Sequence, residues 1–137
     1  MSPRPFLLGS RWIAAGSVLL SAAALLLALP TTASARSGDI IAQGGCTGST
    51  SWKLKLAPRD GGLETEYSVD SNRNGQTWSV TLSDNGTQVF SGVGVTKAPS
   101  GSFSIKLQLR DLAGPDTVKA VASNAATGEI CTGTAVA

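Results

Sequence analysis

The chemistry open to this chain is limited by the reactive side chains that it contains. Its 137 residues include no histidine and only two cysteines, Cys46 and Cys131. The lack of histidine excludes Ser-His-Asp and Cys-His catalytic arrangements and the usual histidine-bearing zinc and copper sites. No glycine-rich phosphate loop follows a strand and opens a helix, so nucleotide binding lacks its physical basis. We therefore expect a protein that is not an enzyme and carries no cofactor.

The most specific local motif for a metal is Asp70-x-Asn72-x-Asn74-Gly75, which matches the opening of a calcium-binding loop. The match then ends, because Thr81 occupies the position that needs a bidentate glutamate. A single carboxylate also supplies too little negative charge for tight calcium binding. Asp70, Asn72 and Asn74 are thus a weak candidate metal site, and the favoured interpretation is a polar turn whose side chains cap their own backbone.

Aromatic side chains offer a second kind of site. Trp52 and Trp78 are candidates for a stacking platform that binds a sugar ring. Both, however, fall in phase with the apolar residues of their predicted strands, and aromatic residues at such positions usually fill the core. Tyr67, Phe90 and Phe103 receive the same interpretation.

The segment from Lys97 to Gly101 is a candidate reactive loop of a secreted protease inhibitor. In that hypothesis Lys97 fills the specificity pocket of a trypsin-like protease. Such a loop needs rigid support, often from a nearby disulfide, and no cysteine is close to it. A plain connector is the favoured interpretation, because loops of this length are common.

The N-terminal segment indicates export. Arg4 and Arg11 are the only charges before an apolar run that lasts to Leu29, and Ala33-Ser34-Ala35 supplies a cleavage site. A positive start, an apolar middle and small residues at the end define a secretory signal peptide, which we assign to residues 1–35. The alternative is an uncleaved N-terminal anchor, since the apolar run approaches the length of a membrane span.

Export changes the interpretation of the charges and of the cysteines. The chain has a net charge of +2, but Arg4 and Arg11 leave with the signal peptide and the exported part is neutral. Without a basic cluster we expect no binding to nucleic acid, and no membrane association once the signal is removed. In an exported protein two cysteines form a disulfide by default, so Cys46 and Cys131 are expected to be bridged.

The elements that must position these residues are predicted to be strands. Short runs of alternating apolar and polar residues are separated by turn clusters, and no stretch has a helical period. Residues 36–45 are expected to be a lead-in and 46–137 a single domain. Seven strands are expected, at Trp52–Leu56, Leu63–Val69, Trp78–Leu82, Thr87–Val95, Ser102–Arg110, Thr117–Ser123 and Glu129–Val136.

Two hairpins can be predicted in more detail. Asn85-Gly86 tolerates the positive φ of a tight hairpin turn. In the first hairpin, a register in which residue numbers sum to 119 pairs Leu56 with Leu63 and Trp52 with Tyr67. On the other face the same register pairs two lysines with glutamates, Lys55 with Glu64 and Lys53 with Glu66, which selects this pairing over a one-residue slip.

The run from Asp116 to Asn124, followed by Gly128 and another strand, resembles the closing strand pair of fibronectin type III and immunoglobulin-like domains. Trp78-Ser79-Val80-Thr81-Leu82 resembles their tryptophan-bearing central strand. The chain is similar to small secreted immunoglobulin-like proteins of high-GC Gram-positive bacteria, which implies a seven-stranded antiparallel sandwich. It departs from them in its cysteines, which would tie the chain ends instead of two central strands, and in lacking a tyrosine corner. The strand topology is therefore left open and no binding residues carry over.

Together these features predict an all-β, immunoglobulin-like sandwich with one disulfide, exported as a monomer. We expect a non-catalytic binding or structural module whose partner is an extracellular protein or glycan. The alternatives are a protease inhibitor that uses residues 97–101 and a glycan-binding module that uses an exposed tryptophan. A small-molecule carrier is not separated from these by sequence.

Overall fold

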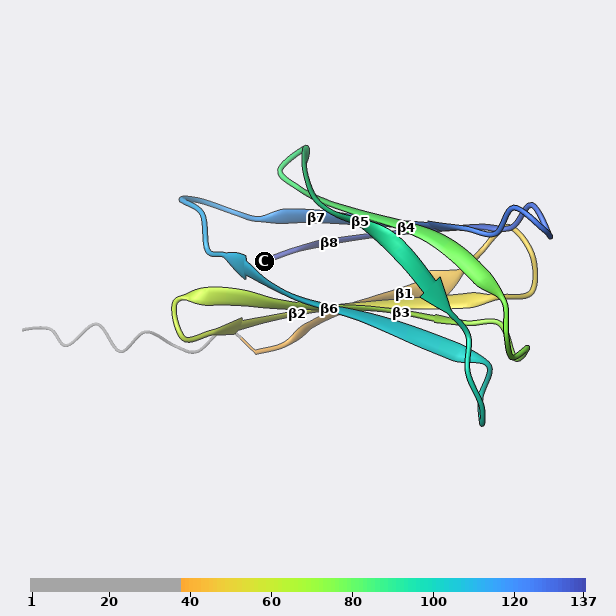
Figure 1. Cartoon of the computed structure of the whole chain (residues 1–137). Coiled ribbons are helices and arrows are strands. Elements are labelled where there is room, and N and C mark those ends of the chain that lie inside the picture. Colours follow the sequence, from red (N-terminus) through yellow and green to blue (C-terminus); the bar gives the residue numbers. More distant parts are fainter. Residues whose placement is uncertain (1–37) are drawn as a thin grey trace, which may run out of the picture. The chain divides into compact units, whose positions relative to one another are not determined.

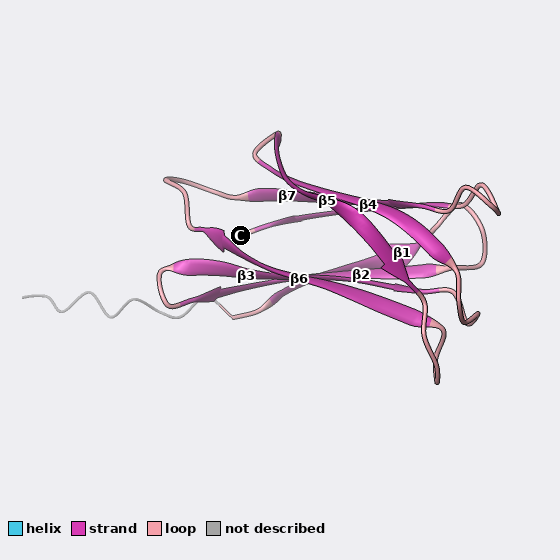
Figure 2. Cartoon of the chain, in the orientation of Figure 1, coloured by secondary structure: helices cyan, strands magenta, loops and turns pink. Residues whose placement is uncertain are grey.

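The computed structural model describes residues 38–137, so the predicted signal peptide and its cleavage site lie outside the described residues. All regular secondary structure in this range is β (Figure 2). These residues include no helix that is long and apolar enough to cross a membrane. The eight strands are β1 (Ile40–Gly45), β2 (Ser51–Arg59), β3 (Gly62–Asp70), β4 (Thr77–Asp84), β5 (Thr87–Val95), β6 (Ser102–Arg110), β7 (Thr117–Ser123) and β8 (Ile130–Val136).

The strands form two antiparallel sheets that pack face to face (Figure 1). The first sheet has the order β1-β2-β3-β6 and the second the order β5-β4-β7-β8. Alternate residues of each strand face the space between the sheets, as the buried and exposed positions of β4 and β8 illustrate. The predicted all-β antiparallel sandwich with one disulfide is confirmed, with eight strands instead of seven.

The additional strand is β1, which lies in the segment expected to be a lead-in. It pairs with β2 along its whole length, from Ile40 opposite Leu56 to Gly45 opposite Ser51. The inward-facing residues of β1 become smaller toward the C-terminal end of the strand. At Gly44 the Trp52 indole fills the space that a side chain would occupy. A glycine-rich strand of this kind lacks the alternating apolar signal that identified the others.

The predicted register of the first hairpin is wrong by two residues. Leu56 lies opposite Thr65 and Trp52 opposite Val69, so residue numbers sum to 121. The reason is the turn: only Asp60 and Gly61 form it, both with positive φ, as a tight two-residue hairpin requires. Because the shift is even, each residue keeps its predicted face. The same turn type occurs at Asn85-Gly86, where the predicted hairpin is confirmed.

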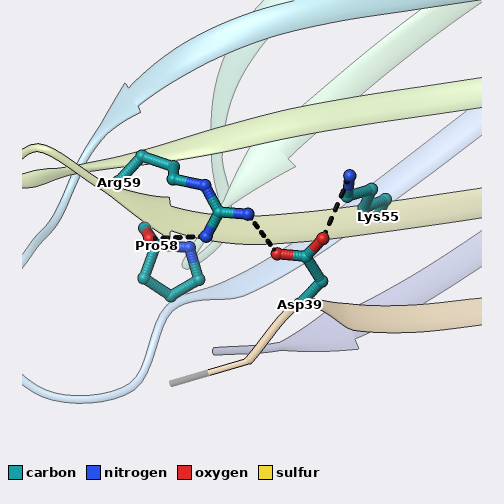
Figure 3. Close-up of polar contacts among 4 residues, drawn as sticks. All are labelled: Asp39, Lys55, Pro58 and Arg59. Carbon is teal, nitrogen blue, oxygen red and sulfur yellow. Dashed lines mark hydrogen bonds and ion pairs between the residues drawn. The ribbon is translucent and has the colours of Figure 1, made fainter. Parts of the chain in front are cut away.

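The predicted ion pairs of this hairpin are also replaced. Lys55 Nζ lies 3.1 Å from Asp39, and the Arg59 guanidinium lies 2.6 Å from the other oxygen of the same carboxylate (Figure 3). Hydrogen bonds from Lys55 and then Arg59 hold the pKa of Asp39 below its usual value. Within residues 38–137 neither Glu64 nor Glu66 forms an ion pair. These exposed contacts help to align β1 on β2 and add little stability.

The core combines leucines and a tyrosine of the first sheet with Trp78 of β4 and the smaller side chains of β7 and β8. Tyr67 is fully buried and its hydroxyl donates to the Cys131 carbonyl, 3.1 Å away, which joins the two sheets. The predicted disulfide is present between Cys46, just after β1, and Cys131 in β8. The buried cluster comprises Leu54, Leu56, Leu63, Tyr67, Val69, Trp78, Val80, Leu82, Leu109, Val118, Ala120, Ala122, Cys131 and Ala135.

Candidate functional site

An open groove of about 700 Å³ lies over the outer face of the first sheet. Its walls come from all four strands, because the register aligns outward-facing residues across the sheet. One row of cross-strand neighbours is Gln43, Lys53, Ser68 and Ser104. The row on one side of it is Ser51, Asp70 and Ser102, and Glu66 lies in the row on its other side. These residues are distant in sequence, and only the sheet brings them together.

The groove is a surface of hydrogen-bonding groups. The hydroxyls of Ser68 and Ser104 lie 2.7 Å apart, and each hydroxyl is able both to donate and to accept. Lys53 is exposed, and Glu66 and Asp70 are partly exposed. The groove thus holds one cation and two carboxylates in contact with solvent. Its chemistry suits recognition of a polar ligand.

The two predicted core tryptophans differ in environment. Trp78 is completely buried, which confirms its predicted place in the core. Trp52 is partly buried and packs against the core from the inward face of β2. Its indole packs against Gly44 and Gly133, and its Nε1 donates to the Gly45 carbonyl at 3.2 Å. The ring therefore lies between the two sheets, on the same inward face of β2 as Leu54, and packs against the core as predicted. Tyr67 is buried as predicted, whereas Phe90 and Phe103 are partly buried against the core.

The candidate metal residues lie in the turn after β3. Asp70 Oδ1 accepts a hydrogen bond from the Asn72 backbone at 3.0 Å, and Asn72 has a positive φ of 57°. This is the self-capping turn that the sequence favours. Asn72 and Asn74 are exposed. Within residues 38–137 no group of three or more His, Cys, Asp or Glu side chains is placed to hold a metal ion.

The candidate inhibitor loop forms a closed turn between β5 and β6. The Lys97 backbone nitrogen donates to the Ser102 carbonyl at 3.0 Å, and the Lys97 carbonyl accepts from Gly101 at 2.9 Å. Lys97 and Ser102 also form an isolated β-bridge. Extended peptides are recognised through free main-chain groups. The Lys97 side chain is exposed, but its backbone is already engaged inside the loop.

We expect this loop to fail as a trypsin inhibitor. Saturating amounts of the protein should leave the hydrolysis rate of a small trypsin substrate unchanged, because the Lys97 backbone cannot pair with the protease without opening the turn. The peptide bond after Lys97 should also stay intact in the folded protein, as intact mass would show. Saturable inhibition that is lost in Lys97→Ala would contradict this expectation.

Sequence reasoning missed the groove as a unit. It did not single out Ser68 or Ser104, although both follow the same period-two pattern as the core residues. The signal available in the sequence is that three serines, Ser68, Ser102 and Ser104, occupy outward positions of β3 and β6. Comparison with models of known families, with curated proteins and with solved structures finds no match to this chain.

Proposed function

We propose that this chain is exported and that its sandwich is a non-catalytic binding module whose ligand lies in the groove of the first sheet. The observation that carries the proposal is the continuous row of Gln43, Lys53, Ser68 and Ser104 across four strands. A rigid sheet presents these groups in fixed positions, which reduces the entropy lost when a ligand binds. The signal-like residues 1–35 and the disulfide support export.

The strand order supports the resemblance to immunoglobulin-like domains. The orders β2-β3-β6 and β4-β7-β8 correspond to strands A-B-E and C-F-G of that architecture. In this correspondence β5 takes the place of C′, and β1 is an addition beside strand A. Trp78 then lies on strand C, where immunoglobulin domains carry their buried tryptophan. Sandwiches of this kind are scaffolds that recognise many different ligands, so the groove, and not the fold, indicates the ligand.

The groove favours a ligand rich in hydroxyl groups, and we propose a glycan. Serine hydroxyls and the Gln43 amide both donate and accept, as sugar hydroxyls do. Glu66 and Asp70 add acceptors and Lys53 adds donors without giving the groove a strong net charge.

Removing two groove hydroxyls should weaken glycan binding about thirtyfold. Ser68→Ala with Ser104→Ala deletes two hydrogen-bonding groups, each worth about 1 kcal/mol, and 1.4 kcal/mol corresponds to a tenfold change in affinity. Calorimetric titration with short neutral and N-acetylated oligosaccharides would measure the change.

The matched control is Ser79→Ala with Thr81→Ala, which removes two hydroxyls from the outer face of the second sheet. This variant should bind as the unchanged protein does. Oligosaccharides that fail to bind the unchanged protein, or that bind the Ser68/Ser104 variant equally well, would contradict the proposal.

A further inference from the structure

A separate pocket lies at the end of the sandwich that carries the β4–β5 hairpin. Its volume is about 260 Å³, and its lining includes Asp84, Val89, Leu109, Arg110 and Leu112. It shares no lining residue with the groove of the first sheet. The pocket therefore requires its own explanation, independent of the proposed glycan site.

Asp84 is an unusual residue for this position. It follows Trp78, Val80 and Leu82 on the inward face of β4, and its side chain is only 5% exposed. No protein group donates a hydrogen bond to its buried Oδ1. No cation lies within ion-pair distance of it among the described residues, where both ion pairs involve Asp39. A buried carboxylate without a partner is costly, so its presence needs a reason.

A second carboxylate increases this cost. Asp116, immediately before β7, is 2% exposed, and its Oδ1 accepts a hydrogen bond from the Asn85 amide at 3.3 Å. Burial raises the pKa of the Asp84 carboxyl, and the neighbouring Asp116 raises it further. Arg110 lines the pocket from β6 but is exposed and forms no ion pair with Asp84. These two carboxylates outnumber the one guanidinium that lines the pocket.

We propose that this pocket binds a small organic cation, with an alkylammonium group against Asp84 and its apolar body against Val89, Leu109 and Leu112. The ammonium would supply the donor and the positive charge that Asp84 lacks in the protein. The three apolar side chains would cover the alkyl part, as in pockets where a few polar groups fix the orientation of a mainly apolar ligand. The same chemistry belongs to a free amine and to a lysine side chain.

The test compares ligands that differ only in their head group. The purified protein is titrated at pH 7 with n-hexylammonium, 1-hexanol and hexanoate, and binding is followed by calorimetry or amide chemical shifts. We expect hexylammonium to saturate the pocket with at least a tenfold lower Kd than hexanol, and hexanoate to bind most weakly. Equal affinities for hexylammonium and hexanoate, or no saturation by hexylammonium, would overturn the proposal.

Variants of the pocket separate charge from shape. Asp84→Asn should weaken hexylammonium binding at least tenfold while hexanol still binds, which demonstrates an intact pocket. Asp111→Asn, which changes an exposed carboxylate outside the pocket, is the control and should bind normally. Arg110→Gln should bind hexylammonium several-fold more tightly, because a competing positive charge is removed. Unchanged hexylammonium affinity in Asp84→Asn would refute the assignment.

A fourth ligand distinguishes the two sources of the ammonium group. Nα-acetyl-lysine amide carries the same head group on a chain of similar length, attached to a peptide backbone. Tighter binding than hexylammonium would identify a lysine side chain of another protein as the ligand. Weaker binding would identify a free amine. Both results require the affinity to depend on Asp84.

Discussion

Replacing Cys46 and Cys131 together by alanine should lower the free energy of unfolding by about 4.5 kcal/mol. The disulfide joins residues separated by 85 positions in the sequence, so it restrains almost the whole described chain in the unfolded state. In the loop-closure account, the entropy removed from the unfolded chain grows with the length of the closed loop. This loss is comparable to the whole stability of many small domains. Urea denaturation of both proteins would measure it.

Reduction provides an independent form of this experiment. The folded protein should take up no alkylating agent until a reductant is added, because both cysteines are in the disulfide. After reduction, the urea midpoint should fall to that of the Cys46→Ala/Cys131→Ala variant. Matching midpoints for the oxidised, reduced and double-alanine proteins would show that the bridge contributes no stability, contrary to this account.

The strands were predictable from alternation, and their exact pairing was not. Seven strands have inward residues large enough to produce a visible pattern, whereas β1 ends in Gly44 and Gly45 and does not. The register error in the first hairpin came from ending one predicted strand at Leu56 and beginning the next at Leu63, although both strands continue to the turn. Asp60-Gly61 alone forms it, and this dipeptide is a known signal for a two-residue turn. Turn chemistry would therefore have corrected the register.

The candidate sites were less accessible to sequence reasoning than the fold. The groove depends on which strands are neighbours, and β3 pairs with β6 across more than thirty intervening residues. That pairing brings Ser68 beside Ser104, a contact that alternation within each strand does not indicate. Asp84 differs, because its position two residues after Leu82 places it on the inward face. Following the alternation to the end of β4 would have identified it.

The other large expected effect comes from Gly101, the last residue of the turn between β5 and β6. It has a φ of +75° and is buried, and an added Cβ would collide with the Arg73 backbone nitrogen. Its carbonyl accepts two hydrogen bonds from Ser71, from the backbone nitrogen at 3.0 Å and from the hydroxyl at 3.2 Å. Gly101 therefore holds the turn after β3 against the turn before β6.

We expect Gly101→Ala to lower the free energy of unfolding by roughly 3 kcal/mol, the combined result of a strained φ and a collision that forces the Arg73 backbone to shift. Gly114→Ala is the control, since Gly114 has a φ of +82° but open space around it. It should lose only about 1 kcal/mol, the cost of the φ alone. Urea midpoints of the two variants would separate conformation from contact.

The same pair of variants connects this turn to the groove. Asp70 and Ser102 line the groove and lie next to the two segments that Gly101 holds together. In Gly101→Ala, displacement of the Arg73 backbone should therefore shift both side chains and weaken oligosaccharide binding. The affinity is measured under conditions in which the variant is still folded. Gly114→Ala lies in the connection before β7, away from the groove lining, and should keep full affinity. Equal stability losses in the two variants would show that the contact with Arg73 has no energetic role.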